Sequence, residues 1–342
     1  MYEFELAKAA DELIKNMFAV KEKETVVITY DTLSDPDVVQ AVAASAHSAG
    51  AYPMSVQIAA PEGIGKAADP DIPVKALTGL LREADVWIEF NKQWLLYSTP
   101  FEIVQKENQK LRYMCLVEFN KELMVRTIGK VDSRKLRPFM NRITELTRQA
   151  KTMRAVTSAG TDVSFEIEPS HRVQCDCGDA SVPGTHFLTG QINVVPRFGT
   201  VNGTIVFDGS ICPPFGRIVT EPVTLVVKNS RITNIQGGSD AAELLKWLKS
   251  LDDENMFKMA HIAYAFNPGA QLTGNIVEDE RVWGATEWGV GYVSAYDAPP
   301  AGQDAKSHFD GICLNSTIWL DDRQILKDGA VTDPELKELS PR

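Results

Sequence analysis

In the first 150 positions, short apolar runs alternate with segments of helical periodicity. The runs TVVITY (25–30), AYPMSVQIA (51–59), DVWIEF (85–90) and KLRYMCLVEF (110–119) are rich in β-branched and aromatic residues, which are typical of strands. The alanine-rich segment 37–50 between the first two runs has the spacing of a helix and ends at a glycine. Apolar strands that alternate with helices predict a parallel sheet covered on both faces.

Three further segments have helical periodicity, at residues 1–19, 72–84 and 133–150. Together with the strands they predict an α/β domain over residues 1–150, with a doubly wound, mostly parallel sheet. No G-x-G-x-x-G follows the first strand, and no P-loop motif occurs in the chain. The layout is Rossmann-like, but the sequence lacks the parts that bind a dinucleotide or a nucleotide phosphate.

From Arg154 the pattern changes to the period-two alternation of hairpins, with one further helix at 240–251. Residues 222–235 read as a hairpin that turns at Asn229 and Ser230. We expect a second, α+β domain over residues 151–342. The glycine- and proline-punctuated segment 175–196 is predicted to be a long loop, and long ordered loops tend to be functional.

Composition narrows the choice of partner. The chain has 342 residues and a net charge of −11, without a run of basic residues, which argues against nucleic acid or an anionic membrane surface as ligand. No apolar run approaches the length of a membrane span, roughly 20 residues. The five cysteines are scattered and no secretory signal precedes them, so we expect a cytoplasmic protein without a disulfide framework that acts on a small molecule.

A candidate metal site lies in the second domain. His308 and Asp310 are two residues apart, and on a strand such residues point to the same face. His261, which opens the apolar run HIAYAF, is the best candidate for a third ligand. Two histidines and one carboxylate suit non-haem Fe(II) with open positions, or a catalytic Zn²⁺ with one water. The alternative interpretation is that these are structural histidines.

Two other places in the chain can contact a substrate. Tyr97 and Ser98 follow the strand 85–90, and ligands of open α/β sheets gather at the carboxyl ends of strands. A loop that only covers the sheet edge explains them equally well. His186, in the long segment 175–196, is a candidate for substrate contact or proton transfer, or else a surface histidine.

The second half of the chain resembles a known superfamily. The ordered motifs TSAGTDVSFEI, VNGTIVFDG, HIAYAFNPGA, GATEWGVG and HFDGI are similar to the carboxy-terminal half of the thermophilic-type metallo-aminopeptidases. The resemblance covers roughly residues 150–330. Those peptidases have a glutamate ligand at the position of His261 and a histidine at the position of Glu287, and INVVPRFGT lacks their earlier glutamate ligand. These departures argue against the two-metal site of the peptidases.

The same departures resemble the 2,5-dihydroxypyridine dioxygenases of nicotinate breakdown, mononuclear Fe(II) enzymes that share the fold. Their ligands match His261, His308 and Asp310, and His186 falls at the position of a substrate-contacting histidine. Tyr97 stands where that family has a histidine, and Gln174 where it has a glutamate. The resemblance therefore implies the metal chemistry and leaves the substrate open.

What the resemblance implies is an extradiol-type ring-cleaving dioxygenase with one Fe(II) per chain and O₂ as co-substrate. The substrate would be a hydroxylated pyridine or a related aromatic. His186 would move a proton or donate to the substrate, Glu287 would act as a nearby acid, and Tyr97, Ser98 and Gln174 would orient the ring. A family of this type also implies a homo-oligomer.

Two alternatives to the dioxygenase stay open. The first is a Zn²⁺- or Mn²⁺-dependent hydrolase of the aminopeptidase type, with Glu287 as general base to a metal-bound water. The second is a binding protein that has kept the fold and lost the chemistry.

Overall fold

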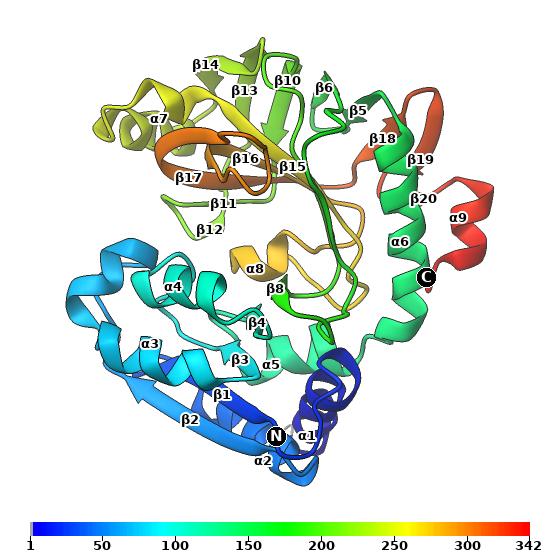
Figure 1. The fold of residues 1–342 in the computed structure, drawn as a ribbon. Helices are drawn as coiled ribbons and strands as arrows, with labels where there is room; N and C mark the ends of the chain where they lie inside the picture. Colours follow the sequence, from blue (N-terminus) through cyan, green and yellow to red (C-terminus); the bar gives the residue numbers. More distant parts are fainter. Residues whose placement is uncertain (1–2) are drawn as a thin grey trace. The chain divides into compact units, whose positions relative to one another are not determined.

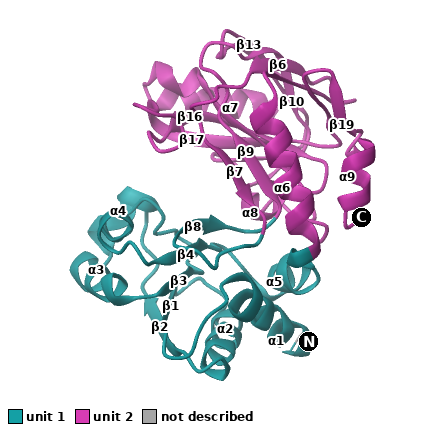
Figure 2. Ribbon diagram, turned by 45° about the vertical axis from the view of Figure 1, so that its right-hand side comes forward, with its two compact units in different colours: residues 1–134, 178–189 teal, residues 135–177, 190–342 magenta. Residues whose placement is uncertain are grey.

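The computed structural model describes residues 3–342, so the first two residues of the helix expected at 1–19 lie outside the described part. The chain divides into two compact units (Figures 1 and 2). Unit 1 comprises residues 1–134 and 178–189, and unit 2 comprises residues 135–177 and 190–342. The mixed α/β class expected from the sequence is confirmed.

Unit 1 is built on a five-stranded parallel sheet of order β2-β1-β3-β4-β8. Its strands are β1 (Thr25–Asp31), β2 (Tyr52–Ile58), β3 (Val86–Glu89), β4 (Arg112–Cys115) and β8 (Gly184–Phe187). The inner strands β3 and β4 are buried along their whole length, as a parallel sheet covered on both faces requires.

Two groups of helices cover the sheet of unit 1 (Figure 2). One group contains α1 (Glu3–Asp11), α2 (Pro36–Ser48) and α5 (Lys121–Met124), and the other contains α3 (Val74–Glu83) and α4 (Thr99–Glu107). Shorter helical segments span Glu12–Met17, Gly65–Asp71 and Val125–Gly129. Helix α2 starts at Pro36, because Asp35 accepts a hydrogen bond from the amide of Asp37 and Pro36 takes the first helical position.

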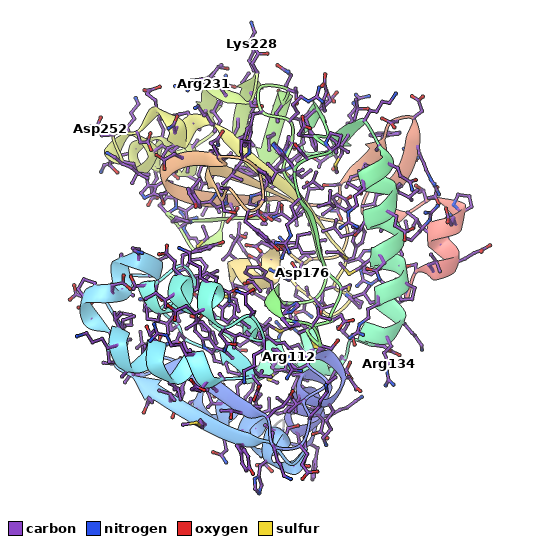
Figure 3. All side chains as sticks on the ribbon, in the orientation of Figure 1. Arg112, Arg134, Asp176, Lys228, Arg231 and Asp252 are labelled. Atoms are coloured by element: carbon purple, nitrogen blue, oxygen red, sulfur yellow. The ribbon has the colours of Figure 1, made fainter. Side chains whose placement is uncertain are left out.

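Arg112 ties the sheet of unit 1 to the segment that follows the first helix. Its side chain, labelled in Figure 3, donates to the carbonyl oxygen of Phe18 at 2.7 Å and to the carboxylate of Glu24 at 2.6 Å. The guanidinium is almost fully buried, so both contacts replace water that it loses on folding.

Unit 2 contains two antiparallel sheets. The eight-stranded sheet has the order β14-β13-β10-β6-β5-β18-β19-β20. Its strands are β5 (Thr152–Val156), β6 (Asp162–Glu166), β10 (Asn202–Phe207), β13 (Val223–Lys228), β14 (Arg231–Gln236), β18 (Thr317–Leu320), β19 (Arg323–Lys327) and β20 (Ala330–Val331). The hairpin β13–β14 turns at Asn229 and Ser230, both with positive φ, as expected.

The seven-stranded sheet has the order β12-β11-β17-β16-β15-β9-β7. Its strands are β7 (Val173–Asp176), β9 (Gln191–Val194), β11 (Ser210–Cys212), β12 (Arg217–Ile218), β15 (Met259–Ala265), β16 (Thr286–Val293) and β17 (Gln303–Cys313). The helices of unit 2 are α6 (Ser133–Gln149, whose first two residues are assigned to unit 1), α7 (Ser239–Ser250), α8 (Ile276–Asp279) and α9 (Pro334–Leu339), with a 3₁₀ turn at Glu254–Phe257.

Aromatic contacts join the two sheets of unit 2 face to face. Phe165 of β6 meets Trp288 of β16 edge to face at a centroid distance of 6.3 Å, and Phe207 of β10 meets Phe309 of β17 at 6.5 Å. Side chains alternate along a strand, so the residues next to Trp288 and Phe309 point the other way. One face of the seven-stranded sheet therefore forms the core, and its opposite face is left to carry polar groups.

Two details differ from the sequence-based expectation. Segment 175–196, expected to be a loop, contains the end of β7, the whole of β8 and β9, and β8 joins the parallel sheet of unit 1. The expected boundary at residue 150 also differs from the observed division, because most of α6 belongs to unit 2. The short strand β8 lies among glycines and a proline, so local pattern does not reveal its pairing.

Between residues 3 and 342, no helix combines the length and the apolar character that crossing a bilayer requires.

Candidate metal centre

Two strands of the seven-stranded sheet carry the candidate ligands, and a third strand lies between them. His261 lies on β15, and His308 and Asp310 lie on β17, with β16 between them. In the register of the sheet, Gly289 of β16 is paired with His261 on one side and with Asp310 on the other. Paired residues point to the same face. All three side chains therefore stand on the face opposite the aromatic core.

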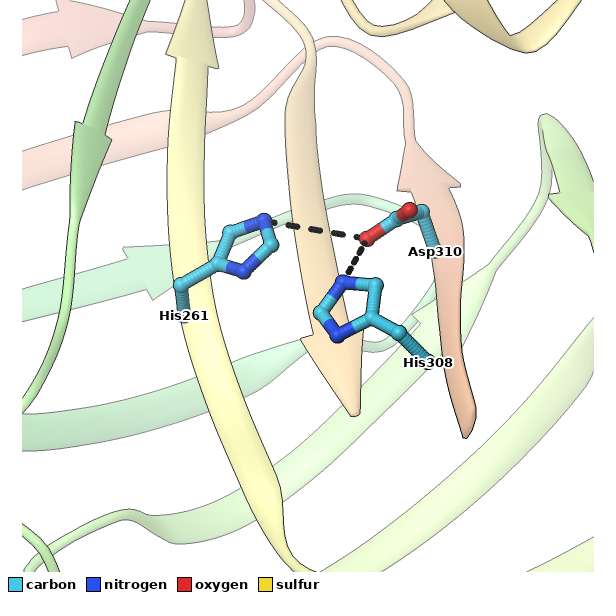
Figure 4. Close-up of side chains that lie close together, drawn as sticks. All are labelled: His261, His308 and Asp310. Carbon is cyan, nitrogen blue, oxygen red and sulfur yellow. Dashed lines mark hydrogen bonds and ion pairs between the residues drawn. The ribbon is translucent and has the colours of Figure 1, made fainter. Parts of the chain in front are cut away.

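The three side chains converge (Figure 4). The Nε2 atom of His308 lies 2.9 Å from Oδ1 of Asp310, and Nε2 of His261 lies 3.7 Å from the same oxygen. One ligand atom from each residue falls within 4.8 Å of the others. The two imidazole rings stack nearly parallel, with centroids 5.0 Å apart. The structure thus brings together the three residues that the sequence singled out.

The hydrogen bonds of His308 fit a cation. Its Nδ1 lies 2.8 Å from the carbonyl oxygen of Tyr292, which can only accept, so Nδ1 carries the proton. In the neutral ring, Nε2 is then a lone pair that faces the Asp310 carboxylate, and two acceptors do not attract each other. A cation between them resolves this conflict, and a backbone carbonyl that fixes the tautomer is typical of metal-bound histidines.

Glu287 is the fourth titratable group of the cluster. Its side chain is only 1% exposed, and its Oε1 lies 2.6 Å from Nε2 of His261. Burial raises the pKa of Glu287 to about 7, although His261 opposes the rise. Burial alone lowers the pKa of His261, but the attraction of Glu287 outweighs it and raises that pKa to about 9. Without a cation, the pair therefore holds a proton at neutral pH, which a metal ion has to displace.

Asp310 keeps its negative charge in the same cluster. Burial opposes ionisation, but the attraction of His308 and His261 holds the pKa of Asp310 below its ordinary value. The carboxylate is 18% exposed, and its Oδ1 lies 2.9 Å from Nε2 of His308. An ionised oxygen ligand beside two imidazoles is a donor set that divalent first-row metals accept.

Gly289 makes room for the His261 ring. A Cβ atom at this position would lie 2.4 Å from Cε1 and 2.5 Å from Nδ1 of His261, distances that no real contact shows. Its backbone conformation is available to any residue, so the requirement for glycine here is purely one of space. Sequence reasoning missed this residue; the alternating glycines of WGVG on one face of β16 were the available signal.

A buried polar network continues from Glu287, and the sequence did not predict it. Gln191 of β9 donates from Nε2 to Oε2 of Glu287 at 2.7 Å and to Oε2 of Glu280 at 3.2 Å. Arg281 donates to Oε1 of Gln191 at 3.1 Å and to Glu280 at 2.7 Å. These residues are scattered along the chain, so no local pattern connects them.

Gln174 stands on the same face of the sheet as the ligands. It lies on β7, in a row of paired residues that runs through Asn193 and Ala263 to Glu287. Three strand spacings separate its backbone from that of Glu287, roughly 14 Å. Its amide nitrogen donates to Oδ1 of Asp176 at 3.0 Å. Gln174 therefore points to the same side of the sheet as the ligands, without contacting them.

The other candidate residues belong to unit 1. His186 lies on β8, and its Nε2 is 2.9 Å from the carbonyl oxygen of Val182, which places the ring proton on Nε2. Tyr97 has a positive φ of 67° and is 53% exposed. Ser98 precedes α4 and is fully buried, and its hydroxyl has no hydrogen-bond partner among the described residues.

In comparisons with known proteins, the matching family and the matching relative have the same description. The sequence model of a family described as 2,5-dihydroxypyridine 5,6-dioxygenase matches residues 10–333. A protein of that name from Pseudomonas putida is 26% identical over an alignment of 342 residues, and the alignment covers 95% of each chain.

Two solved structures share the fold. The structure of 2,5-dihydroxypyridine dioxygenase from Pseudomonas putida KT2440 is similar with a TM-score of 0.80 and 23% identity, and covers 97% of this chain and 98% of its own. Wild-type AmpT from Thermus thermophilus is similar with a TM-score of 0.72 and 13% identity, over 97% of this chain and 100% of its own. The match of the family model along nearly the whole sequence shows that the chain belongs to the 2,5-dihydroxypyridine 5,6-dioxygenase family.

Proposed function

We propose that this protein is an Fe(II)-dependent dioxygenase that opens the ring of a hydroxylated pyridine or a related small aromatic. The observation that carries the proposal is the group of two imidazoles and one carboxylate on one face of a sheet, with the tautomer of His308 fixed by the carbonyl of Tyr292. The names of the relatives support an oxygenase that acts on a nitrogen heterocycle.

His261, His308 and Asp310 would hold the metal from one side. A bound Fe(II) would supply open positions at which a substrate oxygen and O₂ meet, which is the use that proteins make of this donor set. The residues of the chain would orient the ring and manage its protons. A ring hydroxyl is a weak acid, so its deprotonation needs a base within hydrogen-bond reach.

Two residues are suited to proton transfer. Glu287 is a buried carboxyl that already shares a proton with His261, and the Nε2 proton of His186 leaves Nδ1 as the basic nitrogen of its neutral ring. For Gln174, Tyr97 and Ser98 we propose contacts that orient the substrate. Conservative variants of these three would raise KM more than they lower kcat, because they remove binding and not chemistry.

The test is oxygen consumption by protein purified without air and supplied with Fe²⁺. With a suitable dihydroxypyridine or hydroxylated aromatic, we expect O₂ uptake together with loss of the ring absorbance. The H308A variant should lose both the metal and the activity. H47A, which removes an exposed histidine of α2, is the matched control and should behave like the wild type.

Other outcomes would contradict the proposal. Peptide hydrolysis that is sensitive to chelators, needs no oxygen and comes with two metal ions per chain would favour a hydrolase. If H308A binds a ligand as tightly as the wild type does and neither protein contains metal, the chain is a binding protein.

A further inference from the structure

The network behind His261 is more extensive than a ligand set requires. Glu287 turns Oε1 toward His261, at 2.6 Å, and Oε2 toward Gln191, at 2.7 Å. Gln191 is 6% exposed and Arg281 only 2%, so both side chains have given up water for these contacts. Buried polar groups are costly unless they are fully paired. We therefore expect such a network to have a functional role at the site.

The orientation of the Gln191 amide is determined by its neighbours. The guanidinium of Arg281 has only N–H donors, so the atom of Gln191 that faces it has to be the oxygen. The NH₂ group consequently faces the two carboxylates of Glu287 and Glu280. Arg281 thus fixes Gln191, and Gln191 fixes one oxygen of Glu287 and leaves the other directed at the cluster.

The charges of the network match a divalent cation. With the acids ionised, Asp310, Glu287 and Glu280 contribute three negative charges, and Arg281 contributes one positive charge. Neutral histidine ligands add none. With the histidines neutral, as metal ligands are, the network carries a net charge of −2 that a divalent cation balances, and buried charge is retained where it is paired or binds a metal.

We propose that Gln191, held by Arg281, is a positioning residue of the metal centre: it fixes Glu287 so that this carboxylate presents a second negative charge to the cation beside Asp310. The inference rests on the proposed metal site and adds to it the residue that places Glu287. In this arrangement Gln191 acts on the cation through Glu287, so the loss of either should weaken the same interaction.

Cation affinity tests this without any catalytic assay. Co²⁺ binding to wild type, Q191M, E287Q and the double variant is measured by competition with a chromophoric chelator, and the visible absorption of bound Co²⁺ reports on the charge and geometry around it. We expect Q191M to lose about tenfold or more in affinity, the usual effect of removing a group that holds a metal ligand in place. The Co²⁺ spectrum should change with it.

The double variant separates positioning from general damage. If Gln191 acts through Glu287, the double variant should bind Co²⁺ less than about twofold more weakly than E287Q alone. The reason is that the effects of coupled residues are not additive. Q324M, the same change on β19 in the other sheet, is the control and should bind Co²⁺ like the wild type. If Q191M does not fold, Q191N replaces it, since the shorter amide cannot reach both Arg281 and Glu287.

The possible results are distinguishable. Wild-type affinity and an unchanged Co²⁺ spectrum in Q191M overturn the inference, and so do effects of Q191M and E287Q that add in full. A wild-type protein that binds no divalent cation overturns the proposed function itself, and the inference with it.

Discussion

Gly289 determines where the His261 imidazole lies. The ring occupies the space that a side chain on β16 would fill, so any larger residue has to push it away from Asp310. We expect G289A to bind Zn²⁺ or Co²⁺ at least about tenfold more weakly than the wild type, while the sheet still forms. Metal titration followed by circular dichroism measures both.

A matched glycine gives the control for G289A. Gly79 of α3 has no atom within 4 Å of its would-be Cβ, so G79A should leave metal affinity unchanged and stabilise the helix by about 1 kcal/mol. Equal metal affinity of G289A and wild type would show that the His261 ring has another position from which it can bind.

Glu89 gives unit 1 a dependence on pH. It is fully buried at the end of β3, where burial raises its pKa to about 7 despite hydrogen bonds from Tyr113 and the amide of Leu95. The folded state therefore holds a proton that the unfolded chain, with a pKa of 4.5, releases at a lower pH. The stabilisation is fully present below the unfolded pKa of 4.5 and is lost as the pH rises through the folded pKa of about 7.

The variant E89Q does not titrate and isolates this effect. Relative to the wild type, its free energy of unfolding should increase by about 2 kcal/mol between pH 5 and pH 8. Urea unfolding followed by the fluorescence of Trp87, a buried neighbour on β3, provides the measurement. A constant difference across this range would mean that Glu89 is ionised throughout.

At the scale of elements, alternation and periodicity predicted most strands and helices. The spacing of His308 and Asp310 correctly implied one face of a strand, because that relation is local. The contacts of Gln191 with Glu287 and of Gly289 with His261 depend on the order and register of strands that are distant in sequence. No pattern within a segment contains that information. The glycines of WGVG indicate a close approach without showing which side chain approaches, and nothing local points to Gln191.

Asp240 holds the start of α7 against β12. Its carboxylate is 2% exposed and accepts from Arg217 at 2.7 Å and from the amide of Thr220 at 2.6 Å. The hydrogen bond and charge of Arg217 lower the pKa of Asp240 well below its ordinary value. We expect D240N to lower the free energy of unfolding by about 1–3 kcal/mol at pH 7.

The effect of D240N should itself depend on pH. A depressed folded pKa gives stability that is present above the ordinary value of 3.8 and is lost as the pH falls through the folded pKa. The difference in the free energy of unfolding between D240N and wild type should therefore become smaller in strong acid. Thermal unfolding measures it. D322N, at an exposed position after β18, should stay within about 0.5 kcal/mol of the wild type.

At the scale of the whole molecule, the two units have separate sheets, and the candidate ligands belong to unit 2 alone. A cation present at about a hundred times its dissociation constant adds about 2.7 kcal/mol to the stability of the part that binds it. We expect hydrogen exchange of the most protected amides in β15, β16 and β17 to slow about a hundredfold on addition of Zn²⁺. Amides of β1, β3 and β4 should exchange as before, and equal slowing in both units would show that they unfold together.

The passage of residues 178–189 out of unit 2 and into the sheet of unit 1 has a consequence for synthesis. A nascent chain leaving the ribosome can form β1 to β4 early, but the strand that borders β4 is made only after α6 and the first strands of unit 2. Until then, the exposed edge of β4 is open to wrong partners. The first unit to begin folding is thus completed only after the second has started, and a gene cut after residue 134 would leave the first unit without the strand that borders β4.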